Sequence, residues 1–123
     1  MFRLTLVAAL GAAAAALTIA ATAGAMTHPK LIGLVGKNDA YTITLKDHGK
    51  LVKTIKHGTY TFVISDDSAI HNFELDGPHG KSWVFTSVPF KGKKTKTLKL
   101  VAGKYKAYCV AHESQMFQHF TVK

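Results

Sequence analysis

The chain alternates hydrophobic and polar residues over several short stretches, as β-strands with one buried face do. The clearest stretch is 59–65, in which Tyr60, Phe62 and Ile64 would share one face. Similar patterns predict strands over 41–45, 70–75, 95–100, 104–109 and 120–122. No apolar pattern of helical period is longer than about two turns. The predicted elements are therefore strands.

Turn-forming residues separate these strands at short intervals. Examples are Gly58, Gly77 with Pro78, and Gly103. Strands this short need a second sheet to cover their inner faces. We therefore predict an all-β fold, a Greek-key β-sandwich of seven to eight antiparallel strands.

The first 25 residues have a different composition from the rest. They carry one charge, Arg3, followed by an apolar stretch and a small-residue end, Ala23-Gly24-Ala25. This layout is typical of a secretory signal peptide. The alternative is a retained membrane anchor, because 4–21 is nearly long enough to span a bilayer. We expect residues 1–25 to be a signal peptide cleaved after Ala25, which leaves 26–123 as one exported domain in the periplasm or outside the cell.

Size and charge exclude several classes of protein. A domain of this length buries one core but has little room for a catalytic cleft between lobes. The net charge of +9 falls to +8 without Arg3, and every remaining permanent positive charge is a lysine. No arginine is left to read guanine bases, so we expect no nucleic-acid partner. We also expect no stable membrane insertion once residues 1–25 have been cleaved.

The chain has a single cysteine, Cys109, so it cannot form an internal disulfide. A lone thiol in an oxidising compartment is a liability unless it is buried, paired between chains or bound to a metal. Within the next seven residues come His112 and Met116. Thiolate, imidazole and thioether together suit copper that changes oxidation state. His71 adds a second imidazole, because it shares the predicted inner face of 70–75 with Phe73 and Leu75.

These residues resemble those of a known family. The run Asp67-Ser68-Ala69-Ile70-His71-Asn72-Phe73-Glu74-Leu75, followed by Cys109, His112 and Met116, is similar to the ligand segments of the cupredoxins, which are small blue copper proteins. The likeness extends from about Gly58 to Lys123 and keeps the ligand order.

The resemblance implies a role for each matching residue. His71, Cys109 and His112 would hold copper in a trigonal plane, with Met116 at a longer axial distance. Asn72 would tie the two ligand segments together and steady the thiolate. Three residues separate His112 from Met116, where the family commonly has two or four.

The donor set also points to a function. Four protein ligands leave no open position for substrate or water, so the chain is not expected to be a metalloenzyme. We expect a soluble carrier of single electrons; a copper carrier or sequestering protein with the same ligands remains an alternative. A Cys-His nucleophilic enzyme is disfavoured, because no separate acid orients the imidazole.

Two further expectations concern the surface. The lysines of 91–99 could steer acidic redox proteins toward a monomeric carrier. Cleavage after Ala25 would also leave Met26-Thr27-His28 at the amino terminus. The terminal amine, two backbone amides and the His28 imidazole would then form a square-planar Cu(II) site.

Overall fold

The computed structural model describes residues 11–18 and 27–123, and the elements all lie in the second range. The predicted signal peptide and its cleavage site fall largely on residues outside the described part. In the described residues, no helix is long and apolar enough to cross a membrane. The elements are β1 (Lys30–Val35), η1 (Lys37–Asp39), β2 (Ile43–Asp47), β3 (Lys50–Leu51), β4 (Thr54–Ile55), β5 (Gly58–Asp66), β6 (Glu74–Asp76), β7 (Ser82–Val84), β8 (Gly92–Leu100), β9 (Gly103–Tyr108), η2 (Val110–His112) and β10 (Phe117–Val122).

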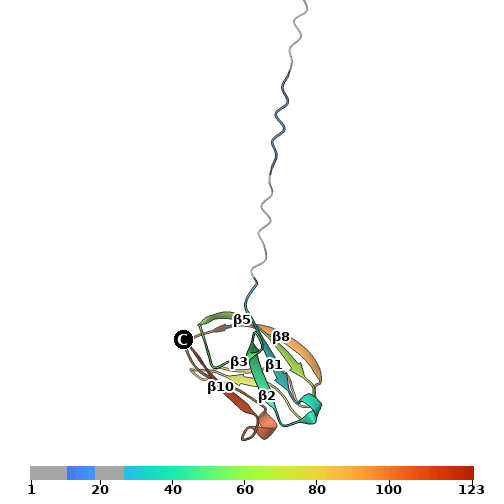
Figure 1. Ribbon diagram of the computed structural model, residues 1–123, viewed down its shortest axis with the longest axis vertical. Helices are drawn as coiled ribbons and strands as arrows, with labels where there is room; N and C mark the ends of the chain where they lie inside the picture. Colours follow the sequence, from blue (N-terminus) through green and yellow to red (C-terminus); the bar gives the residue numbers. More distant parts are fainter. Residues whose placement is uncertain (1–10, 19–26) are drawn as a thin grey trace, which may run out of the picture.

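The strands form two sheets that pack as a sandwich (Figure 1). One has the order β3-β2-β1-β5-β8 and the other the order β4-β10-β9-β6-β7. The predicted all-β sandwich is therefore confirmed. The described residues contain ten strands rather than seven to eight, because β3, β4 and β7 are only two or three residues long.

The turn pattern predicts antiparallel strands only, but the sheets also contain parallel pairs. β1 runs parallel to β5, and β10 runs parallel to β4. Between β1 and β5 the chain passes through β2 and β3, crosses to β4 in the other sheet and returns. It therefore enters β5 in the same direction as β1, which requires a crossover rather than a hairpin.

The core lies between the sheets and follows the alternation. Phe62 and Ile64 of β5 are buried, and Tyr60 packs against the core from its edge. Gly33 of β1 also faces inward, and an added Cβ there would collide with the side chains of Ile64 and Phe73. Close packing at this point therefore excludes any larger residue.

The strand predicted over 70–75 forms only at Glu74–Asp76. The preceding backbone serves other partners, because the N–H of Asn72 donates to Cys109 Sγ and that of Phe73 donates to Thr86 Oγ1. Asn72 is consequently buried together with His71 and Phe73 instead of alternating with them.

The sandwich has two distinct ends. At the site end, Val35, Asp66 and Gly92 lie level with one another. At the terminal end, Gly58 pairs with Leu100, and Gly103 pairs with Val122. The beginning of β1 and the carboxyl terminus also lie toward the terminal end (Figure 1).

Candidate metal centre

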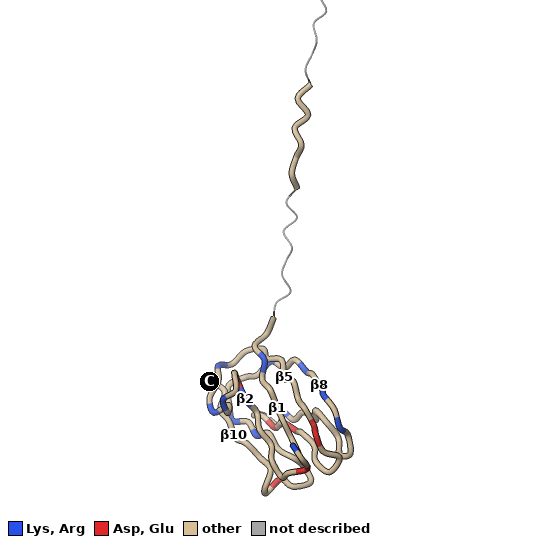
Figure 2. Tube along the Cα trace, turned by 45° about the vertical axis from the view of Figure 1, so that its right-hand side comes forward, with Lys and Arg blue, Asp and Glu red and all other residues tan. Residues whose placement is uncertain are grey.

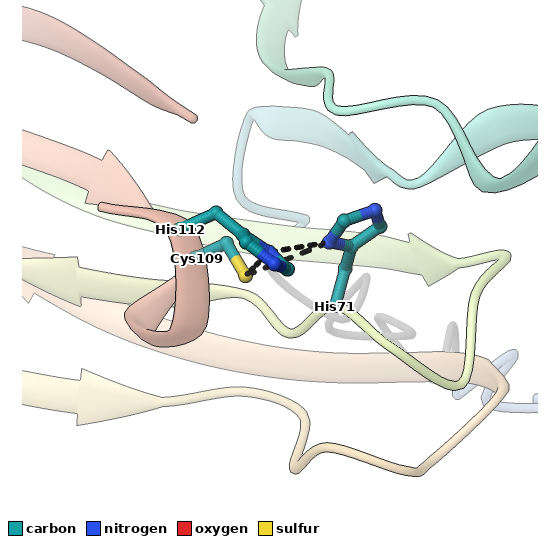
Figure 3. Close-up of side chains that lie close together, drawn as sticks. All are labelled: His71, Cys109 and His112. Atoms are coloured by element: carbon teal, nitrogen blue, oxygen red, sulfur yellow. Dashed lines mark hydrogen bonds between the residues drawn. The ribbon is translucent and has the colours of Figure 1, made fainter. Parts of the chain in front are cut away.

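Three donor side chains meet at the site end (Figure 3). His71 Nδ1 lies 3.0 Å from His112 Nδ1, and Cys109 Sγ lies 3.9 Å and 3.8 Å from these two nitrogens. His71 and Cys109 are fully buried, whereas His112 is partly exposed. The structure thus brings together residues that are 38 positions apart in the chain.

The spacing of these atoms fits a metal ion. A point in their plane lies about 2.0 Å from each nitrogen and about 2.2 Å from the sulfur, close to the bond lengths of imidazole and thiolate ligands. Two imidazoles and one thiolate around such a point form the trigonal arrangement found in blue copper sites. The three residues therefore fit copper without rearrangement.

A short loop presents Cys109, His112 and Met116. Cys109 directly follows β9, and η2 closes with a bond from the His112 N–H to the Cys109 carbonyl. The Met116 N–H donates to the His112 carbonyl, and the Cys109 N–H donates to the Met116 carbonyl. Met116 is buried. These bonds hold the loop closed with its thioether residue beneath the surface.

Asn72 joins this loop to the segment that carries His71. Its Oδ1 accepts from the Val110 N–H at 2.8 Å, and its backbone N–H donates to Cys109 Sγ at 3.4 Å. Its Nδ2 donates to Glu74 Oε2 and to the Thr86 carbonyl. An N–H directed at sulfur stabilises the thiolate and fixes its orientation.

A third loop, 36–42, contacts the centre and was missed by the sequence analysis. The Tyr41 ring stands edge-on to both His71 and His112, with centroid separations of 4.9 and 4.5 Å. His71 Nε2 lies 3.4 Å from the Asp39 carbonyl, a position that favours a proton on Nε2 and leaves Nδ1 free for a metal. Only the turn composition of Gly36-Lys37-Asn38-Asp39 hinted at this loop, because its contacts depend on tertiary packing.

Gly36 allows that loop to approach. Its φ is +70°, and an added Cβ would lie 2.4 Å from Ser68 Cβ and 3.0 Å from His71 Cδ2. A side chain at this position would therefore push directly on the His71 imidazole.

Two groups near the centre have raised pKa values. Burial raises the pKa of Asp66, whose Oδ1 accepts from the Ser68 N–H while Oδ2 has no partner among the described residues. Burial, reinforced by Glu74 and Asp76, raises the pKa of Tyr108 to about 12. Both groups therefore remain protonated to higher pH than they would in water.

Glu113 follows His112 in the sequence and could place negative charge beside it. In the structure its Oε1 lies 2.8 Å from Lys106 Nζ. The Lys106 ammonium also lies over the rings of Tyr108 and Phe117. Much of the negative charge of Glu113 is therefore balanced locally.

The other predicted residues lie away from the centre. His28 is partly exposed just before β1, and its proposed partner Met26 is outside the described residues. The amino-terminal site therefore stays a prediction. Trp83 stacks on Tyr105 as a packing residue, and the remaining histidines are exposed: His48, His57, His79 and His119.

No protein-family model and no curated protein match the chain. Solved structures of the copper protein rusticyanin do. One matches with a TM-score of 0.52 and 17% identity over 76% of each chain. A structure of reduced rusticyanin has a TM-score of 0.51 and 20% identity, again over 76% of each chain. A structure from Thiobacillus ferrooxidans gives 0.48 and 20%, also over 76% of each chain. On the first two matches and the strand topology, this chain has the cupredoxin fold, the fold of the type 1 blue copper proteins.

Proposed function

We propose that this protein carries single electrons through a copper centre held by His71, Cys109, His112 and Met116. The observation that supports this most strongly is that two imidazole nitrogens and one thiolate sulfur surround a single point at metal-bond distances. When bound there, copper would cycle between Cu(II) and Cu(I). With four protein ligands, no position is left for a substrate.

The surrounding residues suit this role. The hydrogen bonds of Asn72 and the edge-on contacts of the Tyr41 ring with both imidazoles hold the donors in one arrangement. Both oxidation states would therefore share nearly the same geometry. His112 is the only one of the three clustered donors with an exposed edge. Val110 and Phe117 beside it are about half exposed and apolar, which suits close contact with another protein.

The partners proposed are redox proteins with an acidic docking face. Lys37, Lys91 and Lys93 are exposed at the site end and would steer such a face toward His112. The apolar pattern of residues 1–25 supports export to the periplasm or outside the cell, and a monomer suffices because one chain supplies every ligand.

The direct test is the visible spectrum after Cu(II) is added to the purified protein. An intense thiolate-to-copper charge-transfer band is expected, and Cys109→Ser should abolish it because Cys109 is the only thiol. His119→Ala is the control, because His119 is exposed and is not one of the clustered donors. A band that survives in Cys109→Ser would refute the assignment.

The same sample separates the electron carrier from a copper carrier or sequestering protein. His71 and Cys109 have no exposed surface, which favours a metal that stays bound. We therefore expect copper to remain bound through repeated oxidation and reduction in the presence of a chelator. Loss of copper to the chelator on reduction would support delivery instead.

A further inference from the structure

A second group of exposed lysines lies at the end of the sandwich opposite the metal centre. Lys99 lies one residue from the end of β8, and Lys104 pairs with Thr121 near the end of β10. Three other exposed lysines share this end, because their backbone carbonyls accept hydrogen bonds from residues near it. We call this set the basic end: Lys53, Lys56, Lys99, Lys104 and Lys123.

Acidic side chains gather at the other end. Asp39, Asp67 and Glu113 lie in its loops, Asp66 ends β5, and Glu74 pairs with Tyr108. None of the five lysines of the basic end forms an ion pair within the part of the chain that the structure describes. Figure 2 shows Lys and Arg positions in both halves of the domain, and most Asp and Glu positions in the half away from the carboxyl terminus. The site end therefore combines carboxylates with lysines such as Lys37, Lys91 and Lys93, whereas the basic end carries lysines that form no ion pair among the described residues.

We propose that the basic end binds an anionic lipid surface. Its lysines come from both sheets and spread over the whole end, which suits a broad array of headgroups. All are lysines, which act as point charges and lack the fork that recognises one phosphate or carboxylate. The described chain also enters β1 at this end of the domain (Figure 1).

This binding mode fixes the orientation of the metal centre. β5 and β8 each have nine residues, and at about 3.3 Å per residue they separate the two ends by about 26 Å. Surface charge is screened over about 8 Å at physiological ionic strength, so the lipid would not act on Lys91 or Lys93. His112 would face away from the lipid and stay free for a soluble partner. The lipid contact involves only the basic end, so it does not rest on the proposed function of the metal centre.

The test compares the full chain with two double variants that remove equal charge from the two ends of the molecule. Lys99→Gln with Lys104→Gln alters the basic end, and Lys91→Gln with Lys93→Gln is the matched control. Each protein is sedimented with vesicles of phosphatidylcholine alone or mixed equally with phosphatidylglycerol. Residues 1–25 contribute to both vesicle types, so the measured quantity is the ratio of binding to anionic and neutral vesicles.

The wild-type ratio should be well above one and should fall as salt is added. Each lysine at a lipid surface contributes about fivefold, so the basic-end variant should lose about 30-fold while the control changes less than about twofold. Circular dichroism on both variants verifies the fold. A wild-type ratio of one, or equal losses in the two variants, would overturn the proposal. It would equally fail if the chain ignored anionic vesicles but bound polyglutamate through the basic end, which would indicate an acidic protein.

Discussion

Gln118 makes a set of hydrogen bonds whose contribution to stability can be predicted. Its Oε1 accepts from the Leu45 N–H at 2.8 Å, and its Nε2 donates to the carbonyls of Leu45 and Val52 at 2.9 and 3.0 Å. Gln118 belongs to β10 and Leu45 to β2, so this side chain connects the two sheets. Gln118→Ala removes all three bonds and leaves the buried backbone of Leu45 without these partners.

The expected loss follows from that count. Each intramolecular hydrogen bond contributes about 1 kcal/mol net, and a buried donor left unpaired costs up to about 3 kcal/mol. We therefore expect Gln118→Ala to lower the free energy of unfolding by about 3–4 kcal/mol. For a domain of this size the melting temperature should fall by about 15 °C.

The assay is urea unfolding of the metal-free protein, followed by the fluorescence of its single tryptophan, Trp83, which is half-buried against Tyr105. Gln115→Ala is the control, since Gln115 is exposed in the loop before Met116 and should change stability by less than about 0.5 kcal/mol. A loss below about 1 kcal/mol for Gln118→Ala, or equal losses in both variants, would refute the reasoning.

Four further predictions concern the centre and the surface. Met116→Leu should keep the blue band and raise the reduction potential measured by redox titration, because loss of a thioether donor disfavours Cu(II); an unchanged potential would show that Met116 is not axial. Because burial raises the pKa of Asp66, the folded state holds its proton to higher pH than the unfolded state does, so stability should fall as pH rises above the ordinary carboxyl range. Asp66→Asn should flatten this profile in urea titrations by an amount on the order of 1 kcal/mol. Electron exchange with an acidic redox protein should slow with added salt, and Lys91→Glu with Lys93→Glu should lower the low-salt rate; a salt-independent rate would remove docking from these lysines. Cu(II) titration of the Cys109→Ser domain that begins at Met26, monitored by absorbance, should reveal a pale second site that His28→Ala abolishes; amino-terminal sequencing that places the cleavage elsewhere would rule this site out.

The sequence predicted those parts of the fold that depend on local alternation. β5 alternates between buried and partly exposed residues, and Leu98 and Leu100 share the inner face at the end of β8, so both strands could be inferred. β1 was missed because Ile32 and Leu34 are apolar yet lie on its outer side, while the inward position 33 is a glycine. Its apolar residues therefore do not alternate.

The candidate metal centre likewise combines residues that are close in the sequence with residues that only folding brings together. Cys109, His112 and Met116 lie in one short segment, so their proximity follows from the chain itself. The contacts of Tyr41 with both imidazoles depend on how loop 36–42 folds over the site. The alternation of Tyr41, Ile43 and Leu45 with threonines instead predicts a strand that begins at Tyr41. Contacts between distant loops leave no periodic signal in a single sequence.

The placement of the ligands also determines how copper would couple to folding. Three of the four proposed ligands lie within eight consecutive residues, whereas His71 is brought in only by the docking of distant segments. An unfolded chain would thus already hold Cu(I) weakly through Cys109, His112 and Met116. A ligand that also binds the unfolded state stabilises the native state less than its total affinity suggests. Copper bound to the unfolded chain would stay bound during folding, and His71 would become the fourth ligand when folding is complete.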